Sequence, residues 1–394
     1  MRTTVCIGFA DALSAPEVCW SLVDAGFHVV AFARAERSCT LRYSKHVKIF
    51  DVPDPAISIS STVAALNREL PLIAAPNALP LVPLDDAAVH ICSLLDSSLN
   101  LVLVGASQKT AAVALDKAMQ LGIAEQSGFN VIPTFRGAET GNVSQQYYPL
   151  VVKPRFAIRD YRGALTKGRL YNLTSRADYD NLATTGKIEP DALIQPFIRG
   201  VGEGVFGLAI DGKVVGWSAH RRVRMMNPGG SGSSACMAIK TEPSVIESAN
   251  QFIVNSGWEG MFMVELLRDE NGKVWFMEFN GRPWGSMALA RRQGFEYPAW
   301  AVGHAVGNDI SAGVFSAKSV ELFCRHLGRE LIHLLCVFRG PQRGHSGEWP
   351  GIYATLKAML FANKPTCWYN WRRDDSFVFF GDMWQTIRGC KRSS

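Results

Sequence analysis

The sequence MVELLRDENGKVWFMEFNGRPWGS (Met263–Ser286) predicts two β-strands joined by a tight turn at residues 269–272. Glu265 lies among apolar residues of the first strand. On the second strand Glu278 and Asn280 alternate with apolar neighbours, so their side chains leave the same face of the sheet. Carboxylates inside apolar strands are costly unless something compensates their charge. A hard cation such as Mg²⁺, which binds carboxylate and phosphate oxygens, would do so.

A polar strand face paired with surface lysines is the alternative interpretation of each of these residues taken alone. The combination is harder to explain in that way, because the pattern E-x-N-x-R at Glu278–Arg282 follows a turn and a second carboxylate, Glu265, lies on the partner strand. We therefore favour a metal site at this hairpin.

Size and composition indicate an ordinary globular protein with room for two or three domains. The chain has 394 residues, of which 47% are hydrophobic and 19% charged, and its net charge is only +6. Basic residues gather at Arg221, Arg222 and Arg224 and in the C-terminal tail. A nucleic-acid surface needs a continuous basic face, so we expect a local anionic ligand and no nucleic acid.

Cysteine usage and hydropathy bear on the compartment. The nine cysteines are odd in number and widely spaced, and none has zinc-site spacing. No signal peptide is evident and no apolar run reaches the ~18 residues of a membrane span. These features predict a cytoplasmic protein. Residues 322–338 resemble an amphipathic helix that packs on the protein, which leaves peripheral membrane contact as an alternative.

The first hundred residues alternate strand and helix. Predicted strands at 3–9 and 27–33 flank a helix at 15–25, which is a βαβ unit of a parallel sheet. The first turn, beginning at Gly8, lacks the G-x-G-x-x-G pattern of a dinucleotide site. We therefore predict a Rossmann-like lobe without a nicotinamide cofactor.

The middle of the chain carries further candidate residues. A helix at 110–121 contains Asp116 and Lys117 and ends at Gly122, and the strand 150–153 ends in Lys153. Two segments have the composition of loops that close over phosphates: the basic stretch 155–169 and the glycine-rich stretch 227–234. An apolar strand is predicted at 192–198 and runs into Arg199–Gly202. Beyond residue 306 the pattern is mainly helical, at 318–338 and 352–361.

Taken together, these pieces resemble the ATP-grasp superfamily over residues 1–305. Within it the chain looks most like stand-alone carboxylate–amine ligases related to biotin carboxylase and the large subunit of carbamoyl phosphate synthetase. The resemblance implies an α/β fold with a Rossmann-like domain at 1–109 and a two-lobed ATP-grasp domain at 110–305. The small lobe would cover about 110–190 and the large lobe about 191–305, followed by a mainly helical extension at 306–394.

The resemblance implies nucleotide-binding roles for six residues. Lys117 and Lys153 would hold the ATP phosphates, Glu203 the ribose hydroxyls, and the family's hinge strand the adenine through Gln195 and the backbone of Phe197 and Ile198. Many relatives have Glu where this chain has Gln195. An amide still accepts a hydrogen bond from the adenine amino group, so nucleotide binding is retained while base preference is less defined.

The resemblance also implies the reaction centre. Glu265, Glu278 and Asn280 would coordinate one or two Mg²⁺ ions, with Mn²⁺ as an alternative, and Arg282 would face the transferred phosphoryl group. Arg222 and Arg224 lie one pleat apart, and on the same strand face they would receive a substrate carboxylate or acyl phosphate. Arg221 would point the other way, and His220 is more readily explained as a structural histidine than as a base.

The expected activity is an ATP- and Mg²⁺-dependent ligase that converts a carboxylate to an acyl phosphate and joins it to an amine, releasing ADP and phosphate. Two alternatives remain, a bicarbonate-using carboxylase-like enzyme and a non-catalytic ATP-binding regulatory protein. The partners would be small-molecule acids and amines, and a homodimer is left open. For residues 306–394 packing is the default expectation, with a dimer interface or large-substrate recognition as alternatives.

Overall fold

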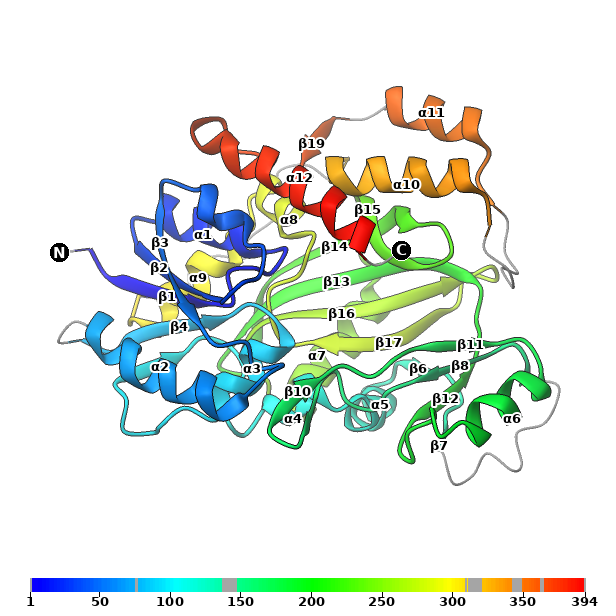
Figure 1. Ribbon diagram of the computed structural model, residues 1–394, viewed down its shortest axis with the longest axis horizontal. Coiled ribbons are helices and arrows are strands. Elements are labelled where there is room, and N and C mark those ends of the chain that lie inside the picture. The colour runs from blue at the N-terminus through cyan, green and yellow to red at the C-terminus, as the bar shows by residue number, and fades with distance from the viewer. Residues whose placement is uncertain are drawn as a thin grey trace.

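A parallel sheet forms the N-terminal part of the computed structural model, which describes residues 2–74, 77–136, 147–308, 310, 321–341, 349–361 and 365–392. Its five strands run in the order β3-β2-β1-β4-β5 and all pair in parallel, as the sequence predicts (Figure 1). The strands are β1 (Thr4–Gly8), β2 (His28–Arg34), β3 (Val47–Val52), β4 (Leu79–Pro83) and β5 (Leu101–Leu103), and the helices are α1 (Ala15–Asp24), α2 (Ile59–Ile73) and α3 (Asp86–Ser93).

The helix predicted at 110–121 is broken into two. Helix α4 (Ala111–Leu115) ends at Asp116, and α5 (Lys117–Gln126) starts directly after it and runs through Gly122. Asp116 has an extended backbone and its carboxylate accepts hydrogen bonds from the amides of Ala118 and Met119. This is an N-cap, a position that aspartate favours over helix interiors. It places Lys117 in the first turn of α5.

A separate four-stranded sheet has the order β11-β8-β12-β7, and the division of the chain into lobes stays a prediction. The basic segment after Lys153 forms the predicted hairpin, whose two strands pair antiparallel. The elements of this region are β7 (Phe135–Arg136), β8 (Leu150–Lys153), β11 (Tyr171–Leu173), β12 (Leu193–Pro196) and α6 (Arg176–Thr184), with the hairpin β9 (Arg159–Tyr161) and β10 (Ala164–Thr166).

The large sheet has eight strands in the order β19-β18-β15-β14-β13-β16-β17-β6 (Figure 1). The hairpin predicted from residues 263–286 supplies the sixth and seventh strands of this order, with the turn closed by Gly272 at a φ of 83°. The elements are β6 (Asn130–Val131), β13 (Gly200–Ile210), β14 (Lys213–Asn227), β15 (Ser231–Ala238), β16 (Gly260–Asp269), β17 (Val274–Asn280), β18 (Phe323–Arg325), β19 (Thr366–Trp368) and α7 (Pro243–Ser256).

The glycine-rich stretch 227–234, predicted as a loop, is partly strand. Strand β14 ends at Asn227 and β15 begins at Ser231, so only a short turn remains between them. Strand β13 begins at Gly200, where glycine is explained by close packing. A Cβ on Gly200 would lie 2.3 Å from the carbonyl oxygen of Arg268, and one on Gly202 would lie 2.8 Å from Cδ of Arg222. These glycines permit close contacts within the sheet.

The two faces of the large sheet pack against different parts of the chain. Phe206 and Met261 contribute to a core shared with β1, α1 and α9 (Tyr297–Ala305). Val205 and Phe276 belong to a second core that includes α5 and α7. Val205 and Phe206 are consecutive in the sequence, so their side chains alternate between the two cores, as in a strand whose sheet is covered on both faces.

The C-terminal part is mainly helical, as predicted, but it also adds β18 and β19 to the edge of the large sheet. The helix predicted at 318–338 begins only at residue 327, because 323–325 are strand; residues 318–320 lie outside the described residues. The remaining helices are α8 (Met287–Arg292), α10 (Leu327–Arg339), α11 (Ile352–Leu360) and α12 (Ser376–Arg392). Among the helices of the described ranges, none has the length and apolar character needed to cross a membrane.

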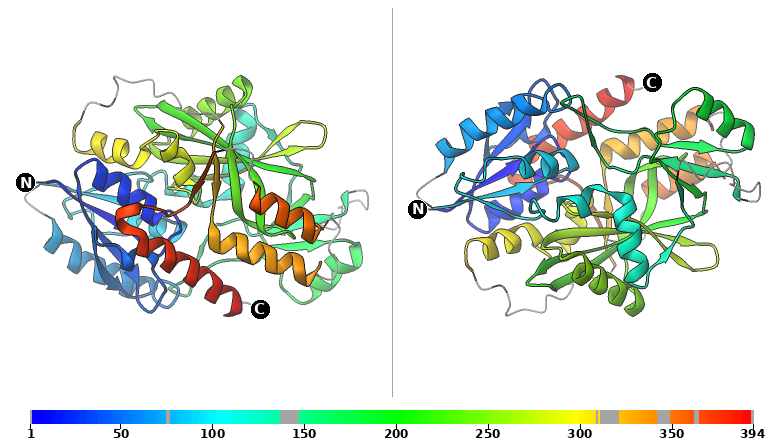
Figure 2. Two further views of the ribbon diagram at one scale, coloured as in Figure 1. Left: turned by 90° about the horizontal axis from the view of Figure 1, so that it is seen from above. Right: turned by 90° about the horizontal axis from the view of Figure 1, so that it is seen from below.

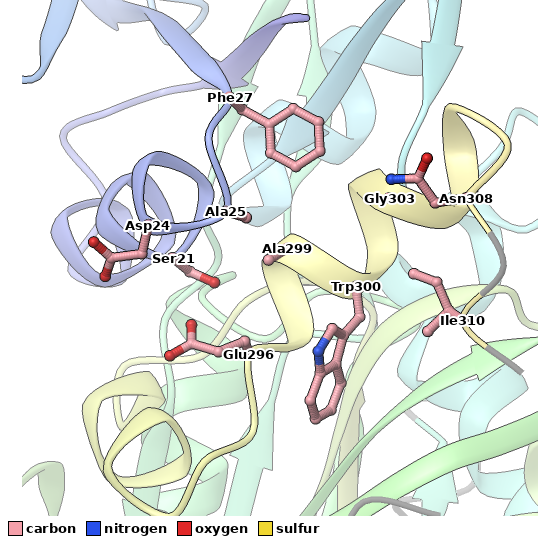
Figure 3. Close-up of a pocket in the computed structure, with 10 residues that line it drawn as sticks. All are labelled: Ser21, Asp24, Ala25, Phe27, Glu296, Ala299, Trp300, Gly303, Asn308 and Ile310. Atoms are coloured by element: carbon pink, nitrogen blue, oxygen red, sulfur yellow. The ribbon is translucent and has the colours of Figure 1, made fainter. Parts of the chain in front are cut away.

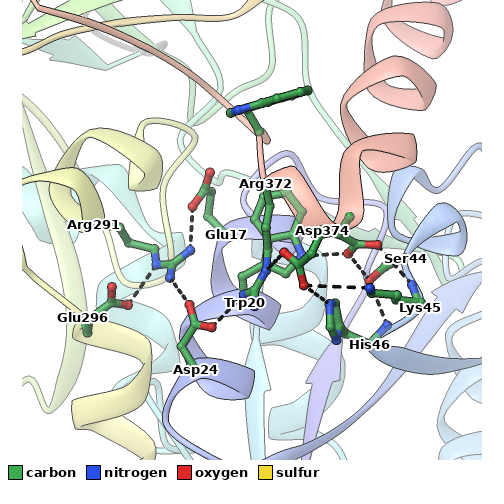
Figure 4. A network of polar contacts seen from close by, with 12 residues as sticks. Glu17, Trp20, Asp24, Ser44, Lys45, His46, Arg291, Glu296, Arg372 and Asp374 are labelled. Carbon is green, nitrogen blue, oxygen red and sulfur yellow. Dashed lines mark hydrogen bonds and ion pairs between the residues drawn. The ribbon is translucent and has the colours of Figure 1, made fainter.

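A polar network fixes this C-terminal part to the N-terminal sheet domain (Figure 4). Arg291 binds Glu17, Asp24 and Glu296 at N–O distances of 2.8, 3.0 and 2.8 Å. Arg372 binds the other oxygen of Asp24 at 2.7 Å. Because Arg291 and Glu17 are both buried, the network constrains how the two regions meet.

Candidate active site

The two predicted metal carboxylates lie directly opposite each other. Glu265 of β16 and Glu278 of β17 are register partners, and Asn280 is paired with Met263 two residues further along. The three oxygen-bearing side chains therefore leave the same face of the hairpin. The structure brings this part of the predicted site together.

Glu278 is the centre of a short hydrogen-bonded chain. Its Oε2 accepts from Lys117 Nζ at 2.8 Å, and its Oε1 accepts from the Asn280 amide at 3.2 Å. Burial by itself would raise the pKa of Glu278, but Lys117 outweighs that effect and the pKa falls to about 2. Glu278 is therefore ionised at neutral pH.

Glu265 has a different balance of charges. Arg222 of β14 approaches its Oε1 at 2.6 Å. Burial nevertheless raises the pKa of Glu265 above its ordinary value, and the neighbouring charge of Glu278 acts in the same direction. Two carboxylates that face each other in this way favour an added cation.

Lys153 lies at the end of β8 and is only 8% exposed. Among the described residues, no carboxylate lies within ion-pair distance of its ammonium group. Burial and, to a smaller extent, the nearby charge of Lys117 lower the pKa of Lys153 to about 8, although Glu278 and Glu265 act in the opposite direction. A buried cation without a carboxylate partner is a natural site for an anion.

Arg282 is held by an aspartate that the sequence analysis missed. Its Nε donates to Asp86 Oδ1 at 2.7 Å, and its Nη2 donates to Asn280 Oδ1 at 2.9 Å. Asp86 is the first residue of α3, so the N-terminal sheet region positions Arg282 beside Glu265 and Glu278, which we call the acid pair. Burial opposes the charge, but Asp86 raises the pKa of Arg282 above its ordinary value. Only folding brings these residues together, and we find no local sequence signal for Asp86.

The hinge residues lie at the end of β12. Gln195 is buried and its amide nitrogen donates to the Thr134 hydroxyl at 2.7 Å. The backbone amide of Phe197 donates to the carbonyl of Pro149 at 2.8 Å, and the ring of Phe197 is exposed. The adenine contacts assigned to Gln195, Phe197 and Ile198 stay predictions.

Glu203 is engaged by two arginines. Its carboxylate lies 2.7 Å from Arg221 and 2.9 Å from Arg268. In the register of β13 with β16, Glu203 is opposite Leu266 and Gly204 is opposite Glu265. Because consecutive residues of a strand point to opposite faces, the side chains of Glu203 and Glu265 lie on opposite faces of the sheet. The ribose role of Glu203 stays a prediction, and Arg221 has the structural partner expected for it.

Arg222 and Arg224 have separate partners. A register shift between them interrupts the regular alternation on which their common strand face was predicted. Arg222 binds Glu265, whereas Arg224 binds Glu330 of α10 through two N–O contacts of 2.8 and 3.1 Å. Glu330 is fully buried and also binds Arg325 at 2.7 Å. Arg224 thus connects the sheet to α10, and its role toward substrate stays a prediction.

His220 has the environment of a structural histidine. Its Nδ1 is 2.9 Å from the Ser286 hydroxyl, and its Nε2 has no partner among the described residues. Burial lowers the pKa of His220 to about 3, with Arg222 adding to the effect. A histidine with that pKa does not accept protons at neutral pH.

The predicted lid arginines are held by acids. Arg155 binds Asp116 at 2.6 Å, and Arg159 binds Asp191 at 2.6 Å. These ion pairs join the β9–β10 region to α5 and to the start of β12. A lid function for this hairpin stays a prediction.

The donor set fits a magnesium–nucleotide complex. Glu265, Glu278 and Asn280 offer oxygen atoms, the ligand type that Mg²⁺ prefers, and this ion usually completes its shell with phosphates and water. Within the described residues there is no group of three or more His, Cys, Asp or Glu side chains that would hold a metal alone. The metal-ligand roles of Glu265, Glu278 and Asn280 stay predictions.

A separate cavity of about 440 Å³ lies between α1 and α9 (Figure 3). Asp24 and Glu296 line it, but both carboxylates bind Arg291. Both of these carboxylates are therefore paired, and none of the predicted site residues lines the cavity.

Neither a family model nor a curated protein sequence matches the chain. Solved structures do resemble it. An L-amino acid ligase from Bacillus licheniformis has 16% identity, a TM-score of 0.59 and coverage of 78% of this chain and 74% of its own. A biotin carboxylase–ATP complex from Campylobacter jejuni has 16% identity, a TM-score of 0.56 and coverage of 80% and 73%.

An N5-carboxyaminoimidazole synthetase from Staphylococcus aureus has 13% identity, a TM-score of 0.59 and coverage of 78% and 79%. At these identities the likeness concerns the fold. The chain has the ATP-grasp fold, related to that of biotin carboxylase, as the sequence resemblance indicated.

Proposed function

We propose that this protein is an ATP- and Mg²⁺-dependent ligase that phosphorylates a carboxylate and joins the resulting acyl phosphate to an amine, releasing ADP and phosphate. The observation that carries the proposal is the pairing of Glu265 with Glu278 next to two lysines, one of which lacks a carboxylate partner among the described residues. Such a site combines metal ligands with a phosphate-binding cation.

The residues divide the work of phosphoryl transfer. Lys153 would bind a nucleotide phosphate, because its ammonium is buried and unpaired within the described chain. Glu265, Glu278 and Asn280 would hold Mg²⁺, which when bound neutralises charge on the terminal phosphates. Arg282, fixed by Asp86, would face the reacting oxygens. In such reactions the protein contributes positioning and charge neutralisation more than covalent chemistry.

The C–N bond is supported by fold likeness to an L-amino acid ligase, and the carboxylase alternative by likeness to biotin carboxylases. We favour the ligase, and the dependence of ADP release on an amine or on bicarbonate distinguishes the two. An acyl phosphate hydrolyses readily, so the amine must capture it before water does.

An ADP-release screen over pairs of acids and amines, followed by mass spectrometry, tests the proposal. We expect ADP only with a matching pair, together with a product whose mass is the sum of the two substrates less one water. Glu278→Gln should abolish ADP release while the protein stays folded, since Gln keeps the shape but removes a metal-binding charge. ADP release that needs bicarbonate instead of an amine would favour the carboxylase, and a Glu278→Gln variant with normal turnover would contradict the metal assignment.

A further inference from the structure

Helix α12 buries one side and exposes an aromatic stripe on the other. Val378 and Phe379 are buried against the protein. The opposite side carries residues spaced as i, i+3, i+7 and i+11, which is the spacing of one helix face. We call it the α12 stripe: Phe377, Phe380, Trp384 and Arg388. Phe377 is 75% and Trp384 50% exposed.

Helix α11 repeats the pattern. Thr355 is buried, while a second outward face has residues at i, i+4, i+7 and i+8. We call it the α11 stripe: Tyr353, Lys357, Leu360 and Phe361. Tyr353 is 81% and Leu360 73% exposed. Large exposed side chains grouped in this way usually mark a binding surface.

The charge at both stripes is positive. The acidic residues of the described parts of α10, α11 and α12 are Glu330 and Asp382, and both are buried. Lys357 and Arg388 are exposed, and the Arg388 guanidinium lies 4.4 Å from the centre of the Trp384 indole ring. The stripes thus combine bulky apolar side chains with cations and carry no exposed carboxylate.

We propose that α11 and α12 dock this protein on the surface of an anionic lipid bilayer. Helices α10, α11 and α12 lie on one side of the molecule, facing the viewer in the view from above (Figure 2). Helices that lie in a membrane interface place Trp, Phe and Leu toward the acyl chains and Lys or Arg near anionic headgroups. Both stripes have this composition.

A second copy of this chain and a nucleic acid are two other possible occupants of the stripes, and the charges argue against both. In a two-fold dimer each patch contacts the same patch of the second copy, so the cations of one copy would find no exposed carboxylate on the stripes of the other. A nucleic acid would satisfy Lys357 and Arg388 but would leave Leu360 and Phe377 in water. An anionic membrane matches both the cations and the apolar side chains.

Vesicle co-sedimentation of the full chain tests the proposal. We expect binding to vesicles of phosphatidylcholine with phosphatidylglycerol, weak binding to phosphatidylcholine alone, and a decrease with added salt. The double variants Phe377→Ser/Trp384→Ser and Leu360→Ser/Phe361→Ser should each reduce binding by about tenfold or more. The matched control is Ile57→Ser/Leu72→Ser, which removes equally exposed apolar side chains from the N-terminal domain and should bind as the wild type does.

Each alternative has its own result. Thermal unfolding of the variants checks that the fold is kept. Failure of the wild type to bind either vesicle, or binding that both stripe variants retain, would overturn the proposal. A wild-type dimer that the α12 variant converts to a monomer, without vesicle binding, would assign the surface to a second copy. Retention of a single-stranded oligonucleotide without vesicle binding would assign it to nucleic acid.

Discussion

Replacing Lys153 by methionine should stabilise the protein and at the same time abolish ATP binding. The Lys153 ammonium is buried and has no carboxylate partner among the described residues, and its pKa is lowered from 10.5 to about 8. Methionine keeps the apolar stem of the side chain and removes the charge. The variant therefore removes a cost of folding together with a phosphate-binding group.

The magnitude follows from the pKa shift. Each pKa unit is worth about 1.4 kcal/mol, so a decrease from 10.5 to about 8 corresponds to roughly 3 kcal/mol of destabilisation by the buried charge. The pKa of Lys153 is lower in the folded protein than in the unfolded chain. The destabilisation by its buried charge is therefore complete below about pH 8 and decreases as the pH rises toward 10.5. At pH 10 it falls below about 1 kcal/mol. For 394 residues the unfolding entropy is about 0.8 kcal/mol per kelvin, so the melting temperature should rise by about 4 °C at pH 7.

Thermal unfolding at pH 7 and pH 10, with and without Mg²⁺ and ATP, measures both effects. Lys117→Met is the matched control, because Lys117 is paired with Glu278 and its loss leaves that carboxylate uncompensated. The side chains of Lys117 and Glu278 are both partly exposed, so Lys117→Met should lower the free energy of unfolding by only about 1–2 kcal/mol. The reasoning is refuted if Lys153→Met lowers the melting temperature at pH 7 as the control does, or if ATP still stabilises the variant.

Three further predictions concern the surrounding charges. The low pKa of Glu278 means that its pair with Lys117 contributes stability above about pH 4.5 that is lost as the pH falls toward 2, so the difference in melting temperature between wild type and Lys117→Met should shrink over that range. Arg224→Gln should lower the free energy of unfolding in urea by about 2–4 kcal/mol, because the buried Glu330 loses one of its two arginine partners; unchanged stability with lost turnover would instead support a substrate role. Calorimetry should show Mg²⁺ binding at least about tenfold more tightly with ATP present than without it, and equal affinities would contradict the assigned ligand set.

Local sequence patterns predicted the features that depend on neighbours along the chain. The 263–286 hairpin, with Glu265 on one strand and Glu278 on the other, and the parallel N-terminal sheet follow from strand periodicity and turn residues. The loop predicted at 227–234 was wrong in part, because residues 231–234 belong to β15 although their glycine and serine content is typical of a loop. At Gly200 and Gly202 the reason for glycine is a backbone carbonyl and an arginine on the two adjacent strands.

The electrostatic partners could not be predicted in the same way. Lys117 and Glu278 are 161 residues apart, and Arg224 and Glu330 are 106 residues apart. No local pattern specifies which acid will neutralise which base, since the choice depends on the folded positions of all of them. The sequence could therefore suggest which residues form the acid pair but not that Asp86 would hold Arg282 beside it.

The charges of the acid pair are already balanced inside the protein, and this bears on how a nucleotide would bind. Glu278 is neutralised by Lys117, and Glu265 by Arg222. A bare metal ion competes with both cations and leaves them without partners, which is costly in an enclosed site. A nucleotide brings phosphates that can accept those cations while the metal takes the carboxylates. The exchange conserves the number of charge pairs, so metal and nucleotide would each raise the affinity of the site for the other. When both are absent, the ion pairs with Lys117 and Arg222 keep the acid pair stable.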